Sequence, residues 1–172
     1  MRMQDIAKAA GVSRQAVYLH FGSRPELLVA ISRHAEEVFG LDERLSRWEK
    51  TRSGVERLAE FIEVWGNFLP SMHGVARALL AAGESDGAAA AAWDDRMTAL
   101  RCGCRTTLAT LERDGRLDPS WTLDSAVDLF WTLLSVRNWE HLISDCGWTQ
   151  EEYKTRMLLT TRELFVAPRA VR

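Results

Sequence analysis

Apolar residues recur at helical spacing along most of the chain, and short polar breaks separate the segments that they define. Apolar positions three and four residues apart place their side chains on one face of an α-helix. No segment shows the strict alternation of apolar and polar residues that is typical of a β-strand. The sequence therefore predicts an all-α protein of about eight helices.

Capping residues, glycines and prolines set the expected helix ends. A serine or threonine before each apolar stripe can accept a hydrogen bond from a first-turn amide. Pro70 is expected to end a helix, because proline has no N–H to donate. The expected helices cover residues 3–10, 14–19, 24–39, 54–69, 72–82, 88–113, 123–143 and 150–165, and a short helical turn or loop covers residues 41–52.

The first two helical patterns flank Gly11-Val12-Ser13, which is the arrangement of a helix-turn-helix. Gly11 can take the left-handed backbone that ends a helix, and Ser13 can cap the next one. At helical spacing, the side chains turned inward are Ile6, Ala10, Val17 and Phe21. The second helix of such a motif enters the major groove of DNA.

A sequence motif runs through the same region, D-I-A-x-x-A-G-V-S-x-x-x-V-Y-x-H-F-x-S-R-x-E-L-L from Asp5 to Leu28. It resembles the DNA-binding signature of the TetR (tetracycline-repressor) family of bacterial transcriptional regulators. The resemblance implies a helix-turn-helix DNA-binding domain with a link helix over residues 1–39. It further implies a helical effector-binding and dimerisation domain over residues 40–172.

Matching the family position by position implies which side chains face DNA. At base edges, an arginine can form two hydrogen bonds with guanine, and a glutamine can form two with adenine. Other positions of the motif lie near sugar-phosphate or contact phosphate. The implied DNA-binding residues are Arg14, Gln15 and Ala16 at base edges, Tyr18 and Leu19 near the backbone and thymine methyls, and Ser13, His20 and Arg24 at phosphates. The alternative is a solvated helix-turn-helix that binds no DNA.

The family usually carries a further helix before the Asp5 block, whereas only Met1 to Gln4 precede it here. We therefore expect the chain as given to start late. The function implied is a ligand-responsive transcriptional repressor, released from a near-palindromic operator by a small hydrophobic or cationic organic effector. The alternative is a helical ligand-binding or protein-interaction module that lacks operator binding because this helix is missing.

Charge is distributed unevenly along the chain. Residues 1–34 carry five basic and two acidic side chains, a balance of +3, whereas the whole chain has a net charge of -2. A basic head on an acidic body suits a protein that contacts phosphates at one end only. No apolar run approaches the length that spans a bilayer, which favours a cytoplasmic protein without a membrane partner.

Three cysteines are an odd number and fit a reducing compartment better than a disulfide framework. Cys102 and Cys104 form a C-x-C pair, but on a helix two residues at ~100° each point to nearly opposite sides. We therefore favour packing over a metal site and expect no metal and no cofactor. No nucleophile, base and orienting group stand at suggestive spacing, so an enzyme is not expected.

In the TetR family, the effector pocket lies within the middle helices, and filling it moves the link helix. Here the inward stripe of these helices is rich in aromatic rings and methionine, which suit an apolar or cationic organic molecule. The implied effector-binding residues are Trp65, Phe68, Leu69, Met72, Trp93, Met97, Arg101 and Trp131. Plain core packing is the alternative for each of them.

The last two predicted helices resemble the pair through which the family forms homodimers. Their apolar residues exceed what one face packed on a monomer core needs. The implied dimer interface consists of Leu123, Val127, Phe130, Leu134, Leu142, Leu158 and Phe165. The alternative is a thick core within a monomer.

Overall fold

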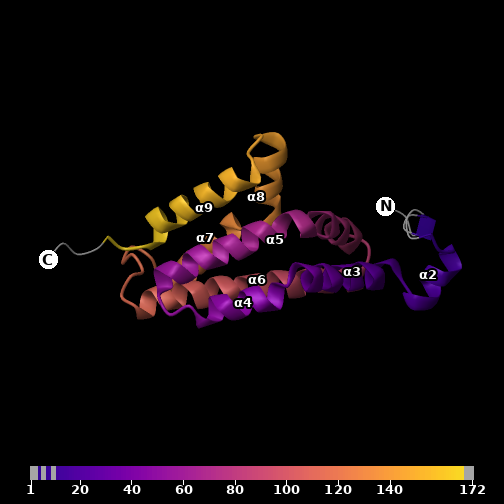
Figure 1. Cartoon of the computed structure of the whole chain (residues 1–172), viewed down its shortest axis with the longest axis horizontal. Coiled ribbons are helices and arrows are strands. Elements are labelled where there is room, and N and C mark those ends of the chain that lie inside the picture. The colour runs from indigo at the N-terminus through magenta and orange to yellow at the C-terminus, as the bar shows by residue number, and fades with distance from the viewer. Residues whose placement is uncertain (1–3, 5–6, 9–10, 169–172) are drawn as a thin grey trace.

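The computed structural model describes residue 4, residues 7 and 8, and residues 11–168, which form an elongated helical molecule (Figure 1). Within the third helix, the side chains of residues 24, 25, 28, 32 and 35 lie outside this description. The helices are α2 (Arg14–His20), α3 (Arg24–Phe39), α4 (Leu41–Lys50), α5 (Gly54–Gly83), α6 (Gly87–Arg113), α7 (Leu123–Leu133), α8 (Val136–Glu140), the π-helix η1 (His141–Asp145) and α9 (Gln150–Phe165). The predicted all-α fold is confirmed.

Several helix ends lie where the capping residues predict them. The Oγ of Ser53 accepts from the amide of Glu56, and the Oγ1 of Thr149 accepts from the amide of Glu152 at 3.1 Å. Gly40 ends α3 with a φ of 64°, in the left-handed region that favours glycine. These ends are local events, so they follow from the neighbouring residues alone.

Helix α4 occupies the segment for which the sequence predicts a short helical turn or loop. Arg44 stabilises the junction between α3 and α4, because its Nε donates to the carbonyl of Phe39 at 3.1 Å and its guanidinium lies over the Phe39 ring. A cation at this place also offsets the negative end of the helix dipole of α3. Trp48 anchors α4 in the core and donates from Nε1 to Thr107 Oγ1 at 3.2 Å.

Helix α5 runs through Pro70, so the predicted helix end at this residue is wrong, and residues 72–82 continue the same helix. The carbonyl of Gly66 would accept from residue 70, but proline has no N–H. The Nε2 of Gln150, at the start of α9, donates to this carbonyl at 2.6 Å instead. A side chain from a distant helix thus supplies the hydrogen bond that the proline removes.

The single helix predicted over residues 123–143 is divided into α7, α8 and η1. At the break, Ser135 Oγ caps α8 by accepting from the amide of Asn138 at 3.2 Å, and Asn138 Nδ2 donates to the carbonyl of Thr132 at 2.6 Å. Trp65 Nε1 donates to the carbonyl of Leu134 at 2.8 Å. Side chains therefore satisfy the backbone groups that the break leaves without helical partners.

Helix α9 is fixed on α5 by a buried lysine. Lys154 Nζ lies 3.0 Å from both Glu63 Oε1 and Asn67 Oδ1, and its stem passes over Gly66, where a Cβ would lie 2.6 Å from Lys154 Cγ. Burial alone would raise the pKa of Glu63, but hydrogen bonds from Asn67 and Lys154 hold that pKa below its ordinary value. The pair therefore stays charged at neutral pH.

The largest core lies among α4 to α9 and contains four of the residues that the sequence assigns to a dimer interface. Val127, Phe130, Leu134 and Phe165 have no exposed surface within a single chain. A partner chain cannot contact them, so this part of the prediction is wrong, and these residues belong to the thick monomer core. Leu123, Leu142 and Leu158 are half-buried and remain accessible to a partner.

In the part of the chain described here, the helices are too short or too polar to cross a bilayer.

Candidate nucleic-acid interface and ligand cavity

The turn before α2 has the geometry expected from its sequence. Gly11 takes a φ of 68°, and the amide of Val12 donates to the carbonyl of Ala7 at 3.0 Å. Ser13 then caps α2, because its Oγ accepts from the amide of Ala16 at 3.0 Å. The hydroxyl hydrogen of Ser13 is still available, so the same side chain can donate to a phosphate.

A small core of its own holds α2 in place. Val17 is 6% exposed and packs with Ala7 and Leu27, and Phe21 and Ile31 cover this cluster. The predicted inward positions of Val17 and Phe21 agree with this packing. Ile6 and Ala10, predicted to lie in the same core, fall outside the described residues. Because Leu27 and Ile31 belong to α3, the head is built directly on that helix.

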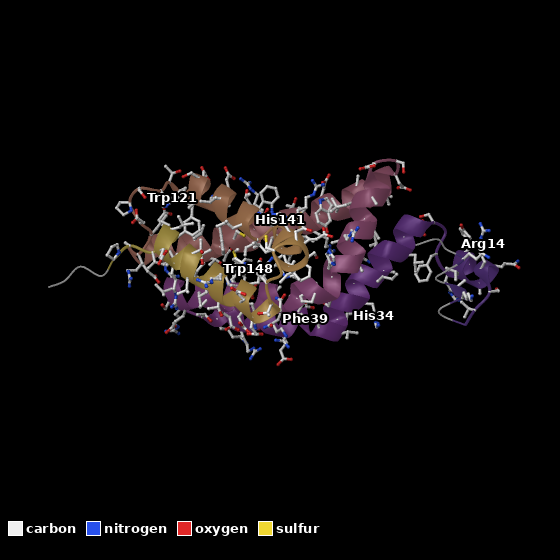
Figure 2. The ribbon with its side chains drawn as sticks, turned by 90° about the horizontal axis from the view of Figure 1, so that it is seen from above. Arg14, His34, Phe39, Trp121, His141 and Trp148 are labelled. Carbon is white, nitrogen blue, oxygen red and sulfur yellow. The ribbon has the colours of Figure 1, made fainter. Side chains whose placement is uncertain are left out.

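The remaining surface of α2 faces solvent. Arg14, Gln15, Tyr18, Leu19 and His20 are all exposed, and Leu19 is 80% exposed, which is unusual for an apolar residue. In Figure 2, Arg14 lies at the far end of the molecule and points away from the body. An exposed leucine between polar side chains suits contact with the methyl groups of thymine.

The other residues predicted to contact DNA are described to different extents. The side chain of Ala16 is half-buried, and its backbone amide donates the hydrogen bond that Ser13 accepts at the start of α2. The guanidinium of Arg14 lies 5.5 Å from the centre of the Tyr18 ring, a cation–π contact that orders both side chains. The side chain of Arg24 lies outside the described residues.

The start of α3 is a helix N-terminus, where an anion such as phosphate could bind. A carboxylate already lies there, since Glu26 Oε2 accepts from the amide of Gly22 at 2.9 Å. The amide of Glu26 in turn donates to Ser23 Oγ at 3.3 Å. These two hydrogen bonds fix the entry into α3, and they leave the amides of Gly22 and Glu26 unavailable to a phosphate.

A cavity of about 450 Å³ lies between α3, α4, α5 and α6. Aromatic rings and methionines line it together with aliphatic side chains, and α3 contributes Glu36 to the wall. The lining residues that the sequence predicted are Trp65, Phe68, Met72, Trp93 and Met97. The lining residues that it missed include Glu36, Asp42, Trp48, Glu49, Phe61 and Arg96. The stripe of large rings therefore identified the apolar wall of the cavity but not its charged side.

Three residues predicted to bind the effector do not line this cavity. Leu69 is fully buried in the core. Arg101 is turned away from the cavity, where it pairs with Asp128 of α7 at 2.5 Å and lies 5.9 Å from the centre of the Trp131 ring. The carboxylate on the neighbouring helix draws Arg101 outward, so Arg101, Trp131 and Leu69 lie outside the wall of this cavity.

The cavity is electronegative. Among the described side chains that line it, Glu36, Asp42 and Glu49 are acidic and Arg96 is basic, which leaves an excess of acidic charge; Asp42 and Glu49 are exposed to solvent. Two of the indoles have already used their N–H groups, because Trp48 donates to Thr107 and Trp65 donates to the carbonyl of Leu134. These two N–H groups are therefore not available to a ligand, which meets the faces of the indole rings instead.

Glu36 and Arg96 form an ion pair across the cavity wall, between α3 and α6. Arg96 Nη1 donates to Glu36 Oε1, and Arg96 Nη2 donates to Asp95 Oδ2 at 3.2 Å. The hydrogen bond that Arg96 donates to the Glu36 carboxylate raises the pKa of Arg96, so the arginine is charged at any physiological pH. Both side chains of the pair are partly shielded, with 21% of Glu36 and 31% of Arg96 exposed.

Comparison with known families agrees with this geometry. Residues 1–31 match the family of bacterial regulatory proteins, tetR family. This match covers the helix-turn-helix and the first turns of α3, so it confirms the family to which the sequence motif points in this part of the chain. No curated protein sequence matches the chain.

Several solved structures share the fold of the whole chain. A protein described as a transcriptional regulator from Saccharomonospora viridis, in complex with choline, superposes with a TM-score of 0.81 at 16% identity, covering 97% of this chain and 88% of that one. A TetR transcription regulator from Haloarcula marismortui gives 0.73 at 16% identity, with coverage of 97% and 88%. PfmR, a TetR family transcriptional regulator from Thermus thermophilus, gives 0.63 at 20% identity, with coverage of 95% and 87%.

Proposed function

We propose that this chain, which carries the DNA-binding region of the TetR family on the fold of TetR regulators, is a transcriptional repressor that an organic cation releases from its operator. One observation carries the proposal: helix α3 belongs both to the head that exposes α2 and to the wall of an electronegative aromatic cavity. A ligand in the cavity therefore contacts the helix on which the DNA-binding surface is built.

In this proposal, residues 1–39 form the DNA-binding domain with its link helix, and residues 40–172 bind the effector and the second chain. Arg14, Gln15 and Ala16 read base edges, Tyr18 and Leu19 lie along the backbone and thymine methyls, and Ser13, His20 and Arg24 contact phosphates. The described side chains of this group other than Ala16 are exposed, which supports these roles.

The repressor acts as a homodimer on a near-palindromic operator. A twofold axis would set two copies of α2 roughly 34–36 Å apart, the spacing of successive major grooves on one side of a duplex. Leu123, Leu142 and Leu158 support the pairing, because each keeps part of its apolar surface exposed in the single chain. The C-terminal helices thus provide the second chain with an apolar surface.

The effector class follows from the cavity wall. A positive charge held between aromatic rings is attracted to their faces, and nearby carboxylates add to the attraction. Glu36, Asp42 and Glu49 outnumber Arg96 on this wall, so a cation is favoured over a neutral or anionic molecule. The similar structure from Saccharomonospora viridis, which holds choline, supports an organic ammonium ion as the ligand.

The operator function is tested by gel mobility shift on DNA from upstream of the gene that encodes the chain. We expect a shifted band whose affinity falls steeply as salt rises, because phosphate contacts release counterions. Absence of a shift at low salt, where these contacts are strongest, would contradict operator binding.

Substitution of Arg14 by alanine should reduce discrimination between operator and random DNA by about 1–3 kcal/mol, because a bidentate arginine contact to a base edge is lost. Substitution of Arg24 by alanine should weaken binding to both DNAs alike and reduce the salt slope by about one, as expected for a phosphate contact. Binding titrations on operator and random DNA at several salt concentrations measure both the discrimination and the salt slope. Equal losses for the two variants on both DNAs would refute the assigned roles.

The effector is tested by thermal unfolding with tetramethylammonium, choline and benzyltrimethylammonium. A ligand that binds only the folded protein raises the melting temperature by mass action. We expect at least one of these cations to raise it and to release the operator. The matched control is 3,3-dimethylbutan-1-ol, the neutral isostere of choline, which should bind more weakly than choline. Equal stabilisation by the alcohol and by choline would refute recognition of charge.

A further inference from the structure

We propose that Glu36 is the residue that senses the ligand: it binds Arg96 of α6 until a ligand cation takes the place of that arginine. This inference rests on the proposed function and adds to it the exchange of partners that would transmit binding to the head. It goes beyond the family resemblance, because neither Glu36 nor Arg96 lies in the region matched by the family.

The first support is position. Glu36 lies on α3 and Arg96 on α6, 60 residues apart in the sequence, and both line the same cavity. Among the described side chains of α3, Glu36 is the one that forms an ion pair with another helix, since His34 pairs with Glu37 of the same helix. Loss of the Glu36–Arg96 pair therefore removes a specific connection between α3 and the body.

The second support is that Arg96 has an alternative partner. Its Nη2 already donates to Asp95 Oδ2 at 3.2 Å, and 71% of the Asp95 side chain is exposed to solvent. If a cation binds Glu36, Arg96 can keep Asp95 and turn toward water. The exchange then leaves no buried charge without a partner, which would otherwise oppose it strongly.

The third support is the way α3 joins head and body. Leu27 and Ile31 of α3 lie in the head core, while Glu36 and Phe39 lie at the body. Phe39 packs on Phe68, with ring centres 5.1 Å apart, and this apolar contact can slide without losing a defined hydrogen bond. Arg44 of α4 also donates to the carbonyl of Phe39 at this end of α3, but the Glu36–Arg96 pair is the directional contact that joins α3 to α6 at the cavity.

Two substitutions of the pair should have opposite effects on ligand binding. Arg96→Gln leaves Glu36 without its competitor, so choline should bind about tenfold more tightly. Glu36→Gln removes the carboxylate itself, so choline should bind about tenfold more weakly. In both variants the α3–α6 ion pair is absent, so operator affinity without ligand should fall toward that of the ligand-bound wild type.

The coupling between the two sites should also disappear. In Arg96→Gln, choline should bind tightly yet change operator affinity less than about twofold, because the contact that it would break is already gone. Arg96→Lys keeps a cation at this position and should restore most of the release by ligand. Isothermal titration measures choline affinity, and fluorescence anisotropy on labelled operator measures the release.

Arg105→Gln is the matched control. Arg105 also lies on α6 and pairs with a carboxylate of another helix, Asp124 of α7, but it does not line the cavity. The Arg105→Gln substitution should leave choline affinity and operator release by choline unchanged. If Arg96→Gln lowers choline affinity or leaves it unchanged, the sensing role of Glu36 is refuted.

The results separate this inference from the function on which it rests. If none of the cations binds wild type or releases its operator, both are wrong. If choline releases the wild-type operator but Glu36→Gln and Arg96→Gln respond like Arg105→Gln, the function stands and the exchange at Glu36 is wrong.

Discussion

Replacing Gly54 by alanine should lower the free energy of unfolding by about 3 kcal/mol, although it adds only one methyl group. Gly54 lies at the start of α5 against α6, where a Cβ would approach the N and Cα of Leu111 to 2.7 Å and the carbonyl carbon of Thr110 to 2.9 Å. These are backbone atoms, so no side-chain rotation relieves the clash. The two helices would have to separate, which weakens the core between them.

Gly74 provides the control within the same helix. A Cβ built at Gly74 meets no atom within 4 Å, and alanine favours the helix over glycine. Gly74→Ala should therefore raise the free energy of unfolding by about 0.5–1 kcal/mol. Urea denaturation followed by circular dichroism measures both variants. Similar small changes for the two would show that α5 and α6 are not in the close contact described.

Replacing Gln150 by leucine should lower the free energy of unfolding by about 2–4 kcal/mol, because it leaves two polar groups without partners. Gln150 Nε2 donates to the carbonyl of Gly66, and its Oε1 accepts from Trp139 Nε1 at 2.8 Å. Leucine has a similar size, so the loss reports the hydrogen bonds rather than a cavity.

A second substitution tests how much of this destabilisation arises because Pro70 cannot donate a hydrogen bond to the carbonyl of Gly66. In a Pro70→Ala background, residue 70 regains an N–H that can donate to Gly66, and Pro70 is exposed, so no core packing is lost. Gln150→Leu should then cost about 1–2 kcal/mol less than in wild type. The double-mutant cycle, measured by urea denaturation, gives this coupling. Independent, additive effects would contradict the compensation of Pro70 by Gln150.

These contacts show where sequence-based prediction reaches its limit. The ends of α2, α3 and α9 were predictable, because Ser13, Ser23 and Thr149 bond to amides three residues away. The continuation of α5 through Pro70 was not, because the compensating donor lies 84 residues from Gly66. A proline signals the missing N–H, but nothing nearby in the sequence signals its replacement.

The candidate sites follow the same rule. The exposed face of α2 was predictable from helical spacing around Val17, and the aromatic wall of the cavity from the stripes on α5 and α6. The charged side was missed because Glu36 and Arg96 meet only through the packing of α3 on α6. Arg101 was misplaced because its partner, Asp128, lies on a neighbouring helix whose position the sequence did not reveal.

Helix α3 has no interruption between Leu27 in the head core and Glu36 at the cavity. An α-helix turns by about 100° and rises about 1.5 Å with each residue. The direction in which Arg14 and its neighbours face is therefore set by the number of residues in this stretch. One inserted alanine would swing the reading surface by more than a quarter turn about the helix axis, whereas seven would return it almost to its original azimuth, about 10 Å farther out. The orientation of α2 relative to the body is thus set by the number of residues in a single helix.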